Sequence, residues 1–365
     1  MRIVITGAGP VGCYLGRLLK YYGFSPVIIE EHREIGIPKH CAGLVGSGLF
    51  EKRKISLPYD VVENEINGAI IFYKGKNFYL ERKGVAFVIN REKFDKKLSE
   101  GLEIRRGAKL SSFEKRGREY LLHTKKEKLK CDILIGADGA TSTVRKKGGL
   151  NLKPTYYKGL QFRVEQKISP PDMVQIYFTK PFLYFCWLIP ESEKITRVGC
   201  ISPYPLKTLK SFMEKIKIRG KIIERMGGVI PIGYGETSKD NIALVGDAAC
   251  QVKPLSGGGL YYGIKCAEVL ADCIKKGEIS SYDREWKKII GKEINLSLRI
   301  RRFLEKKDIR FLERLFNLAR KNSHLIEKIA DFEKHSFSVF SFAKLIEKNI
   351  STILLKDFLR KLLLT

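Results

Sequence analysis

Residues 2–12 read RIVITGAGPVG, and this stretch decides the fold class of the chain. A β-branched run at 3–6 leads directly into glycines spaced G-x-G-x-x-G, and a helical pattern of apolar residues follows. Gly7 permits a tight turn, Gly9 lets backbone approach a pyrophosphate, and Gly12 allows the helix to pack closely on the strand. Amides at the helix N-terminus then point at phosphate oxygens. The stretch predicts a dinucleotide-binding strand, turn and helix.

A second expected strand, residues 26–29, ends in an acid that bears on the nucleotide. Glu30 lies near the separation of about 20 residues at which a carboxylate binds a ribose 2′-hydroxyl. A negative charge at this place disfavours a 2′-phosphate. The adenosine is therefore expected to belong to FAD or NAD rather than to NADP.

A distant glycine-rich segment supplies the other half of the predicted site. An expected strand at 241–245 delivers Asp247, whose carboxylate is expected to accept hydrogen bonds from a ribityl chain. The loop and helix start that follow are expected to bring backbone amides to the pyrimidine edge of a flavin, where positive potential stabilises the anionic reduced form. They comprise Gly257, Gly258, Gly259 and Leu260. The two segments together predict one FAD site.

A third expected strand, residues 131–137, runs into Asp138 and completes a wider resemblance. Over residues 1 to about 280 the chain resembles the glutathione-reductase-type FAD fold in its aromatic-hydroxylase branch. Within that branch it is similar to the geranylgeranyl reductase family, which includes archaeal digeranylgeranylglycerophospholipid reductases. The resemblance implies an α/β fold: an FAD-binding Rossmann domain, an inserted antiparallel-sheet substrate domain and a helical C-terminal region.

Three shorter segments carry the resemblance to this family. Residues 35–43 look like its Pro-x-x-Cys-x-Gly segment, which lies close to the flavin, and residues 88–95 resemble a helix start whose Arg contacts the cofactor. Residues 185–190 are similar to its Tyr-x-Trp-x-Phe-Pro substrate-channel motif, with Phe185 for Tyr and Ile189 for Phe. Cofactor contacts are therefore expected at Gly7, Gly9, Gly12, Glu30, Cys41, Ala42, Gly43, Arg91, Leu110, Asp138, Asp247, Gly257, Gly258, Gly259 and Leu260. Substrate contacts are expected at Phe185 and Trp187.

The resemblance implies reduction of isolated C=C bonds in prenyl chains by reduced FAD. An isolated alkene is a poor hydride acceptor, so the reaction needs a dry channel and a nearby acid. Cys41 is the titratable residue that the motif places near the isoalloxazine, and burial would keep its thiol protonated. It is expected to be a catalytic proton donor or a substrate-positioning group, with simple packing against the flavin as the alternative. His40 is a lesser candidate.

The predicted FAD domain is discontinuous, at residues 1–45, 84–150 and 235–282. Residues 46–83 and 151–234 are predicted to form the substrate domain. Its aromatic side chains Phe162, Phe178, Phe182, Phe185 and Trp187 are available to line a channel, although a place in the core is the favoured interpretation for all except Trp187. Residues 283–365 are predicted to be amphipathic helices, because apolar residues recur at intervals of three and four. These helices are expected to pack on the FAD domain or to lie in a lipid headgroup layer.

A formal net charge of +28 favours anionic partners, such as a phospholipid surface or an acidic, ferredoxin-like electron carrier, with a solvated Lys-rich surface as the alternative interpretation. Nucleic acid is not expected, because no Arg-rich recognition motif accompanies the charge. Eight cysteines show no C-x-x-C pattern, so no metal site is expected. The sequence shows no export signal and no long apolar run, so we expect a cytoplasmic protein with possible peripheral contact at the inner membrane face.

Two other functions share parts of this pattern. An aromatic-ring monooxygenase would have the same FAD motifs but would consume oxygen and a nicotinamide cofactor. A non-redox prenyl-lipid binding protein would share the broader fold, yet it would not need Asp247 or the triple glycine. The sequence leaves open which polyprenyl substrate is used.

Overall fold

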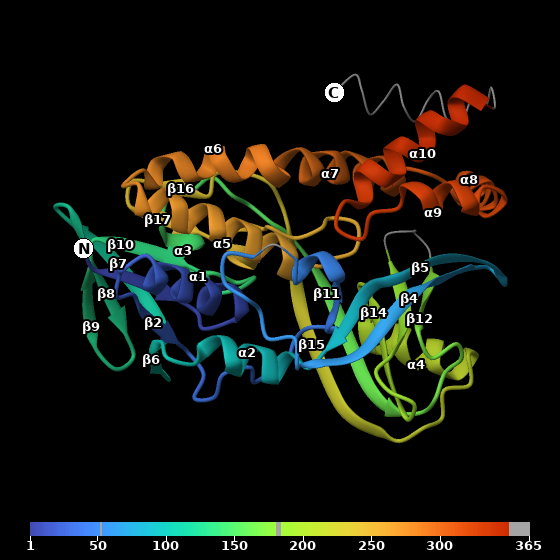
Figure 1. The fold of residues 1–365 in the computed structure, drawn as a ribbon, viewed down its shortest axis with the longest axis horizontal. Coiled ribbons are helices and arrows are strands. Elements are labelled where there is room, and N and C mark those ends of the chain that lie inside the picture. The colour runs from blue at the N-terminus through green and yellow to red at the C-terminus, as the bar shows by residue number, and fades with distance from the viewer. Residues whose placement is uncertain (52, 180–183, 350–365) are drawn as a thin grey trace.

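The structure of the protein is a computed structural model that describes residues 1–51, 53–179 and 184–349. Phe182 and the expected apolar positions after residue 349 lie outside this range. The described chain forms a parallel sheet with helices at one end of the molecule and a larger, mainly antiparallel sheet at the other (Figure 1). The later helices run along the top of both sheets.

The first sheet has six strands, and its core is parallel as the glycine-rich turn predicts. In spatial order the strands are β16 (Ser238–Lys239), β17 (Ile242–Leu244), β10 (Ile133–Gly136), β1 (Ile3–Thr6), β2 (Val27–Glu30) and β6 (Glu103–Arg106). Only β16 runs antiparallel to its neighbour. The four central strands, β17, β10, β1 and β2, are almost continuously apolar, because both faces of the sheet are covered there.

Alternate side chains of this sheet enter two different cores. Ile3 and Ile5 of β1 pack with α1 (Pro10–Tyr21) and α5 (Leu260–Lys275) on one face. Val4, between them, packs on the other face against a small three-stranded sheet. That sheet consists of β7 (Leu110–Arg116), β8 (Glu119–Thr124) and β9 (Lys128–Cys131). Two further helices flank this region: α2 (Arg91–Ser99) and α3 (Thr143–Lys147).

The second large sheet has eight strands. In order they are β15 (Ile222–Ile232), β11 (Thr155–Glu165), β14 (Ile195–Ile201), β13 (Phe185–Pro190), β12 (Met173–Phe178), β4 (Val62–Tyr73), β5 (Lys76–Ile89) and β3 (Leu44–Gly46). The expected antiparallel arrangement needs one correction, because β12 pairs with β4 in parallel. Strand β5 also continues through residue 84, where the sequence places a domain boundary.

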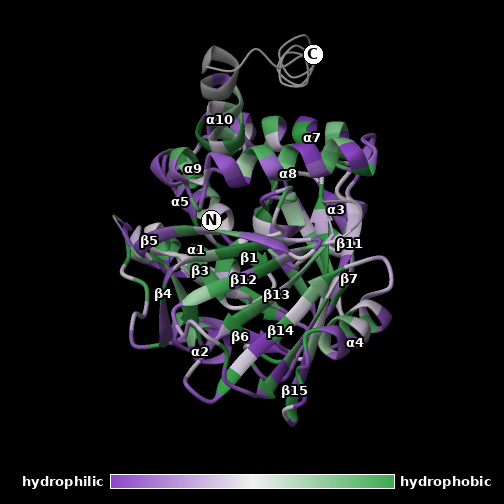
Figure 2. Cartoon of the chain, turned by 90° about the vertical axis from the view of Figure 1, so that its right-hand side faces the viewer, coloured by the Kyte–Doolittle hydropathy of each residue, from purple (hydrophilic) through white to green (hydrophobic). Residues whose placement is uncertain are grey.

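Each face of this sheet has its own covering. Helix α4 (Pro205–Lys215) packs on one face, where Phe162 is buried among Leu209 and Phe212 rather than lining a channel. The other face carries the aromatic residues Phe178, Phe185 and Trp187 toward a cavity. Figure 2 shows apolar residues concentrated along these central strands.

The C-terminal helices lie over both sheets. They are α6 (Tyr282–Trp286), α7 (Lys292–Glu305), α8 (Ile309–Lys321), α9 (Ser323–Ile329) and α10 (His335–Asn349), with a π-helical turn at Lys287–Gly291. Helix α6 packs on α5, as expected for the FAD region. Helices α8 and α9 instead meet β4 and β5 of the other sheet, where Phe316 contacts the rings of Tyr73 and Phe78 at 5.5 and 5.4 Å.

Within the described part of the chain, no helix combines the length and apolar character needed to cross a membrane.

Candidate functional site

A single large cavity connects the two main sheets. Its volume is about 1380 Å³, which exceeds the range of roughly 300–1,000 Å³ usual for one small ligand. At one end it is lined by the loops that follow β1, β2, β10 and β17, and at the other by apolar side chains of the eight-stranded sheet. The cavity can therefore hold a cofactor and a second ligand end to end.

The glycine-rich turn after β1 forms the first wall of the polar end. Gly7 has φ +95°, and a Cβ there would come within 2.4 Å of the Ala137 carbonyl oxygen. A Cβ on Gly12 would overlap the Gly7 carbonyl oxygen at 2.1 Å, so Gly12 lies behind the wall and allows α1 to approach β1. A Cβ on Gly9 would meet nothing within 4 Å, so Gly9 faces open cavity at the N-terminus of α1. This is the arrangement that a pyrophosphate requires.

Two carboxylates lie at the ends of β2 and β10, the strands on either side of β1. Glu30 is 8% exposed at the end of β2 and accepts hydrogen bonds from the amides of Ala8 (2.7 Å) and His32 (2.9 Å). Asp138 follows β10, and its Oδ2 accepts from the Thr143 amide at 2.7 Å. Its Oδ1 is buried without a hydrogen-bond partner among the described residues, and burial raises the pKa of Asp138. Asp138 itself lines the cavity, so this carboxylate lies beside the space for a ligand.

Asp247 occupies the equivalent place after β17. It lies in a 3₁₀ turn (Gly246–Ala249), and no described residue donates a hydrogen bond to its carboxylate. Burial raises the pKa of Asp247, while the charges of Arg91 and Arg145 oppose that shift. Helix α5 begins at Leu260 beside it, and its N-terminal amides face the same cavity. The site thus offers a hydrogen-bond acceptor and a positive helix end side by side.

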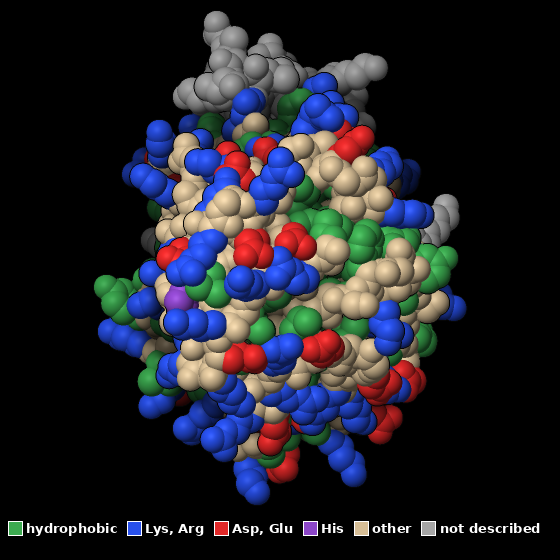
Figure 3. Space-filling model, turned by 90° about the vertical axis from the view of Figure 1, so that its left-hand side faces the viewer, with side chains coloured by type: hydrophobic (Ala, Val, Ile, Leu, Met, Phe, Trp, Pro, Cys, Tyr) green, Lys and Arg blue, Asp and Glu red, His purple; other side chains and the backbone are tan. Residues whose placement is uncertain are grey.

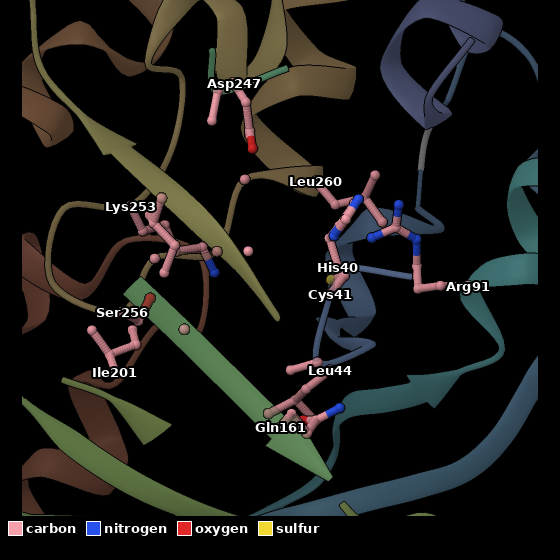
Figure 4. Close-up of a pocket in the computed structure, with 18 of the residues that line it drawn as sticks. His40, Cys41, Leu44, Arg91, Gln161, Ile201, Asp247, Lys253, Ser256 and Leu260 are labelled. Atoms are coloured by element: carbon pink, nitrogen blue, oxygen red, sulfur yellow. The ribbon is translucent and has the colours of Figure 1, made fainter. Parts of the chain in front are cut away.

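The segment around Cys41 forms the opposite wall (Figure 4). Cys41 is half-buried, and its sulfur accepts a hydrogen bond from the Gly43 amide at 3.4 Å. Arg91 lies next to it at the start of α2 and is held by Asp95 through contacts of 3.1 and 3.2 Å. Cys41 and Ala42 line the cavity, whereas Gly43 lies behind it.

A residue that the motifs do not indicate fixes this wall. Arg197 of β14 is 5% exposed and donates to the carbonyl oxygens of Ala42 (2.7 Å) and Ile89 (3.2 Å). A Cβ on Gly43 would come within 1.9 Å of the Arg197 guanidinium, so only glycine leaves room for it. Arg197 also pairs with Glu191 at 2.7 Å. Its guanidinium therefore joins the substrate-side sheet to the flavin-side segment.

The apolar end contains both expected substrate residues. Phe185 and Trp187 lie on β13 with ring centroids 5.8 Å apart. The Trp187 indole N–H donates to Gln161 Oε1 at 2.8 Å, which orients the ring. Opposite Trp187, a Cβ on Gly199 would come within 2.3 Å of the indole. The register of β13 and β14 thus places a glycine where the tryptophan needs space.

The C-terminal helices close this apolar chamber, which the sequence did not reveal. Its inner surface includes Ile300 and Leu304 of α7, Leu315, Phe316 and Ala319 of α8, and Val339 of α10. Their helical periodicity indicated one buried face, but it could not indicate the surface that this face meets. These side chains make the wall that faces Trp187 largely apolar.

The expected cofactor residues are brought together with few exceptions. Of them, Gly12 and Gly43 lie outside the cavity surface, whereas Leu110 lines the cavity. A glycine cradle, a ribose acid, an unpaired buried Asp138 oxygen and a helix N-terminus together fit the phosphate, ribose, ribityl and ring parts of FAD. The residues present are therefore suited to this cofactor.

Comparison with known proteins finds relatives that align with most of the chain. No protein-family model matches it. An uncharacterized protein of Methanocaldococcus jannaschii is 31% identical over 98% of both chains. Digeranylgeranylglycerophospholipid reductase 2 of Methanothermobacter thermautotrophicus is 28% identical over 83% of this chain and 87% of its own length.

A solved structure agrees in fold over nearly the whole chain. The geranylgeranyl bacteriochlorophyll reductase-like protein of Thermoplasma acidophilum superposes with a TM-score of 0.81 at 21% identity, covering 99% of each chain. These matches confirm the fold class and the resemblance inferred from the sequence motifs. The chain belongs to the geranylgeranyl reductase family of flavoproteins.

Proposed function

We propose that the protein is an FAD-dependent reductase that saturates C=C bonds in the geranylgeranyl chains of archaeal-type ether lipids. The observation that carries this proposal is the continuity of the cavity: its polar end fits FAD, and its other end is an apolar chamber at Trp187. Relatives named digeranylgeranylglycerophospholipid reductase support the substrate class.

When bound and reduced, FAD supplies a hydride to one alkene carbon. The chain's own residues create the conditions for that transfer. Gly7, Gly9 and Glu30 hold the adenosine and phosphate part, and Asp247 accepts hydrogen bonds from the ribityl part. The N-terminus of α5 offers positive potential where negative charge develops on reduction. We assign Cys41 to the wall that positions the alkene, because its side chain lines the cavity.

The apolar chamber selects and desolvates the prenyl chain. Phe185 and Trp187 present ring faces from the sheet, and the helices opposite supply aliphatic side chains. Burying each CH₂ group of a prenyl chain contributes about 0.8 kcal/mol, so a long chain is bound strongly without polar contacts. The same surface keeps water away from the reacting carbons.

We further propose that electrons come from an acidic, ferredoxin-like carrier and that the protein contacts the membrane surface peripherally. Figure 3 supports an electrostatic contribution, because Lys and Arg side chains are spread over the face shown, with Asp and Glu between them. A net charge of +28 attracts anionic proteins and anionic lipid surfaces alike.

The decisive experiment reduces the purified protein chemically without oxygen in the presence of a geranylgeranyl lipid. We expect the flavin to be reoxidised and the lipid mass to rise in two-hydrogen steps. Flavin reoxidation only after oxygen is admitted, with a hydroxylated product, would identify a monooxygenase instead. Lipid binding without flavin or mass change would identify a non-redox prenyl-binding protein.

A further inference from the structure

A buried lysine lies in the cavity wall between the flavin-side loop and the C-terminal helices. Lys253 belongs to the loop that joins the Gly246–Ala249 turn to α5, and its side chain is 7% exposed. Its Cδ and Cε lie 3.8 Å from the position of a Cβ on Gly258. The loop is closed by hydrogen bonds from the Lys253 amide to Gly258 O (2.9 Å) and from the Gly257 amide to Lys253 O (2.8 Å). The expected flavin-binding loop therefore carries a cation, and Figure 4 shows the amine directed into the cavity.

The ammonium group is held by the turn between α9 and α10. Its Nζ donates to the Phe332 carbonyl oxygen at 2.6 Å and lies 2.7 Å from Glu333 Oε2. It also lies 4.4 Å from the centre of the Phe332 ring. The Tyr262 hydroxyl donates to the Glu333 carbonyl oxygen at 2.8 Å, which fixes the turn to α5. Glu333 is buried, and the exposed Asp331 accepts a hydrogen bond from the Glu333 backbone amide at 2.7 Å, so a second carboxylate lies near the surface in the same turn.

We propose that Lys253 is the general acid that protonates the alkene and that Glu333 returns a proton to it. The inference rests on the proposed function. The alkene receives a hydride at one carbon, with both electrons supplied by the reduced flavin, which becomes oxidised. The electron pair of the double bond forms a new C–H bond with the Lys253 proton, and the N–H bond breaks to leave a neutral amine. The amine then takes up a proton from solvent through Glu333.

The surroundings of Lys253 favour this role. Burial lowers the pKa of Lys253, while Glu333, Asp331 and Glu293 oppose the shift. A desolvated ammonium gives up its proton more readily than an exposed one, and the nearby carboxylates oppose that loss. His335, which also faces it, is a poor donor because burial and the Lys253 charge lower its pKa to about 3.

Other charged groups around the cavity are less suited to donate. Arg91 remains protonated at every accessible pH and cannot act as an acid. Asp247 is assigned to the ribityl chain. Cys41 lies on the opposite wall (Figure 4), and its role as the donor becomes one outcome of the test.

The first test compares K253R and K253M with the wild type in the FAD-loaded protein. Each is reduced chemically, mixed with a geranylgeranyl lipid without oxygen, and followed by flavin absorbance and lipid mass. We expect both variants to bind FAD normally and to reoxidise roughly 10²–10⁴-fold more slowly. Arginine keeps the charge but cannot release the proton. A wild-type rate in K253R would show that Lys253 acts only as an ion-pair partner. Loss of rate in C41S alone would show that Cys41 is the proton donor.

The second test uses E333Q and the pH dependence of the same single turnover. The acid must be protonated, so the rate falls as pH rises through the pKa of Lys253. Removing the Glu333 carboxylate lowers that pKa further, and we expect the alkaline limb to move to lower pH. A uniform loss of rate with an unmoved limb would assign Glu333 a structural role only and would overturn the relay. K265M is the matched control, because Lys265 pairs with Glu268 outside the cavity wall.

A third measurement does not depend on turnover. NMR of the FAD-loaded protein carrying ¹³C at the lysine Cε atoms, recorded across a pH series, reports the pKa of a buried amine, and K253M identifies the Lys253 signal. We expect Lys253 to titrate at lower pH than Lys265, and at lower pH still in E333Q. Titration of Lys253 together with the exposed lysines would overturn the inference. If the wild type fails to saturate the lipid while Lys253 titrates as expected, the proposed function is wrong.

Discussion

The two ends of the cavity are built by opposite means. At the polar end, backbone amides and carboxylates come from loops that each follow one parallel strand, and positions such as Gly7 tolerate no side chain. At the apolar end, side chains from distant segments meet, as Phe78 of β5 meets Phe316 of α8. Backbone geometry and charge therefore limit which substitutions the polar end accepts, whereas side-chain volume limits which substitutions the apolar end accepts.

Arg197 lies where the two ends join, and its loss should have the largest effect. Arg197→Met would remove the donors to Ala42 and Ile89 and leave Glu191 with Arg163 as its remaining partner. Breaking a buried ion pair costs about 3–5 kcal/mol. Because Glu191 keeps its contact with Arg163, we expect the free energy of unfolding to fall by an amount near the lower limit, about 3 kcal/mol. Urea unfolding of the FAD-free protein measures this free energy. An unchanged free energy of unfolding would show that the two ends are not coupled through Arg197.

Much of the polar end could be predicted from sequence, for a physical reason. Gly7 and Gly12 are required by close backbone contacts within one strand-turn-helix unit, so their spacing alone indicates the structure. The fold class and the family followed from such local motifs.

Arg197 and Lys253 could not be found in this way. Each acts through partners more than 70 residues away, namely Ala42 for Arg197 and Glu333 for Lys253. The parallel pairing of β12 with β4 is likewise set by tertiary contacts, because strand pattern alone does not reveal strand neighbours.

Within the polar end, Asp247→Ala should reduce FAD affinity. Loss of hydrogen bonds to a charged group costs about 1.5–3 kcal/mol, which corresponds to roughly ten- to a hundred-fold in dissociation constant. Flavin fluorescence during dilution measures the release of FAD. Asp240→Ala serves as the control, since Asp240 lies on the surface and pairs with Lys115. Equal FAD retention in the two variants would contradict the assignment of Asp247.

At the apolar end, Ala319→Phe should shorten the chamber without touching the cofactor. Overpacking typically costs about 1–3 kcal/mol, so a geranylgeranyl lipid should react about tenfold more slowly while a shorter prenyl substrate is unaffected. FAD content should equal that of the wild type. Arg320→Phe places the same ring on the exposed side of α8 and is the control. Equal slowing of short and long substrates would show that α8 does not bound the chain-binding space.

The smallest expected effect concerns electron supply, which tests whether the polar end accepts anything besides FAD. The described residues contain one glycine-rich turn of this kind, at the carboxyl end of the parallel strands. Under the proposed function FAD occupies this turn, so the described residues offer no second one to a nicotinamide cofactor. Reduction by NADPH alone should then be slow. An acidic ferredoxin-like carrier should be attracted by the +28 charge, and its rate should fall about tenfold between low and physiological salt because exposed charges are screened. Stopped-flow mixing at several salt concentrations measures both reactions. Rapid, saturable bleaching by NADPH would show that the cavity admits a second dinucleotide, and a salt-independent carrier rate would show that the dispersed positive surface does not guide the donor.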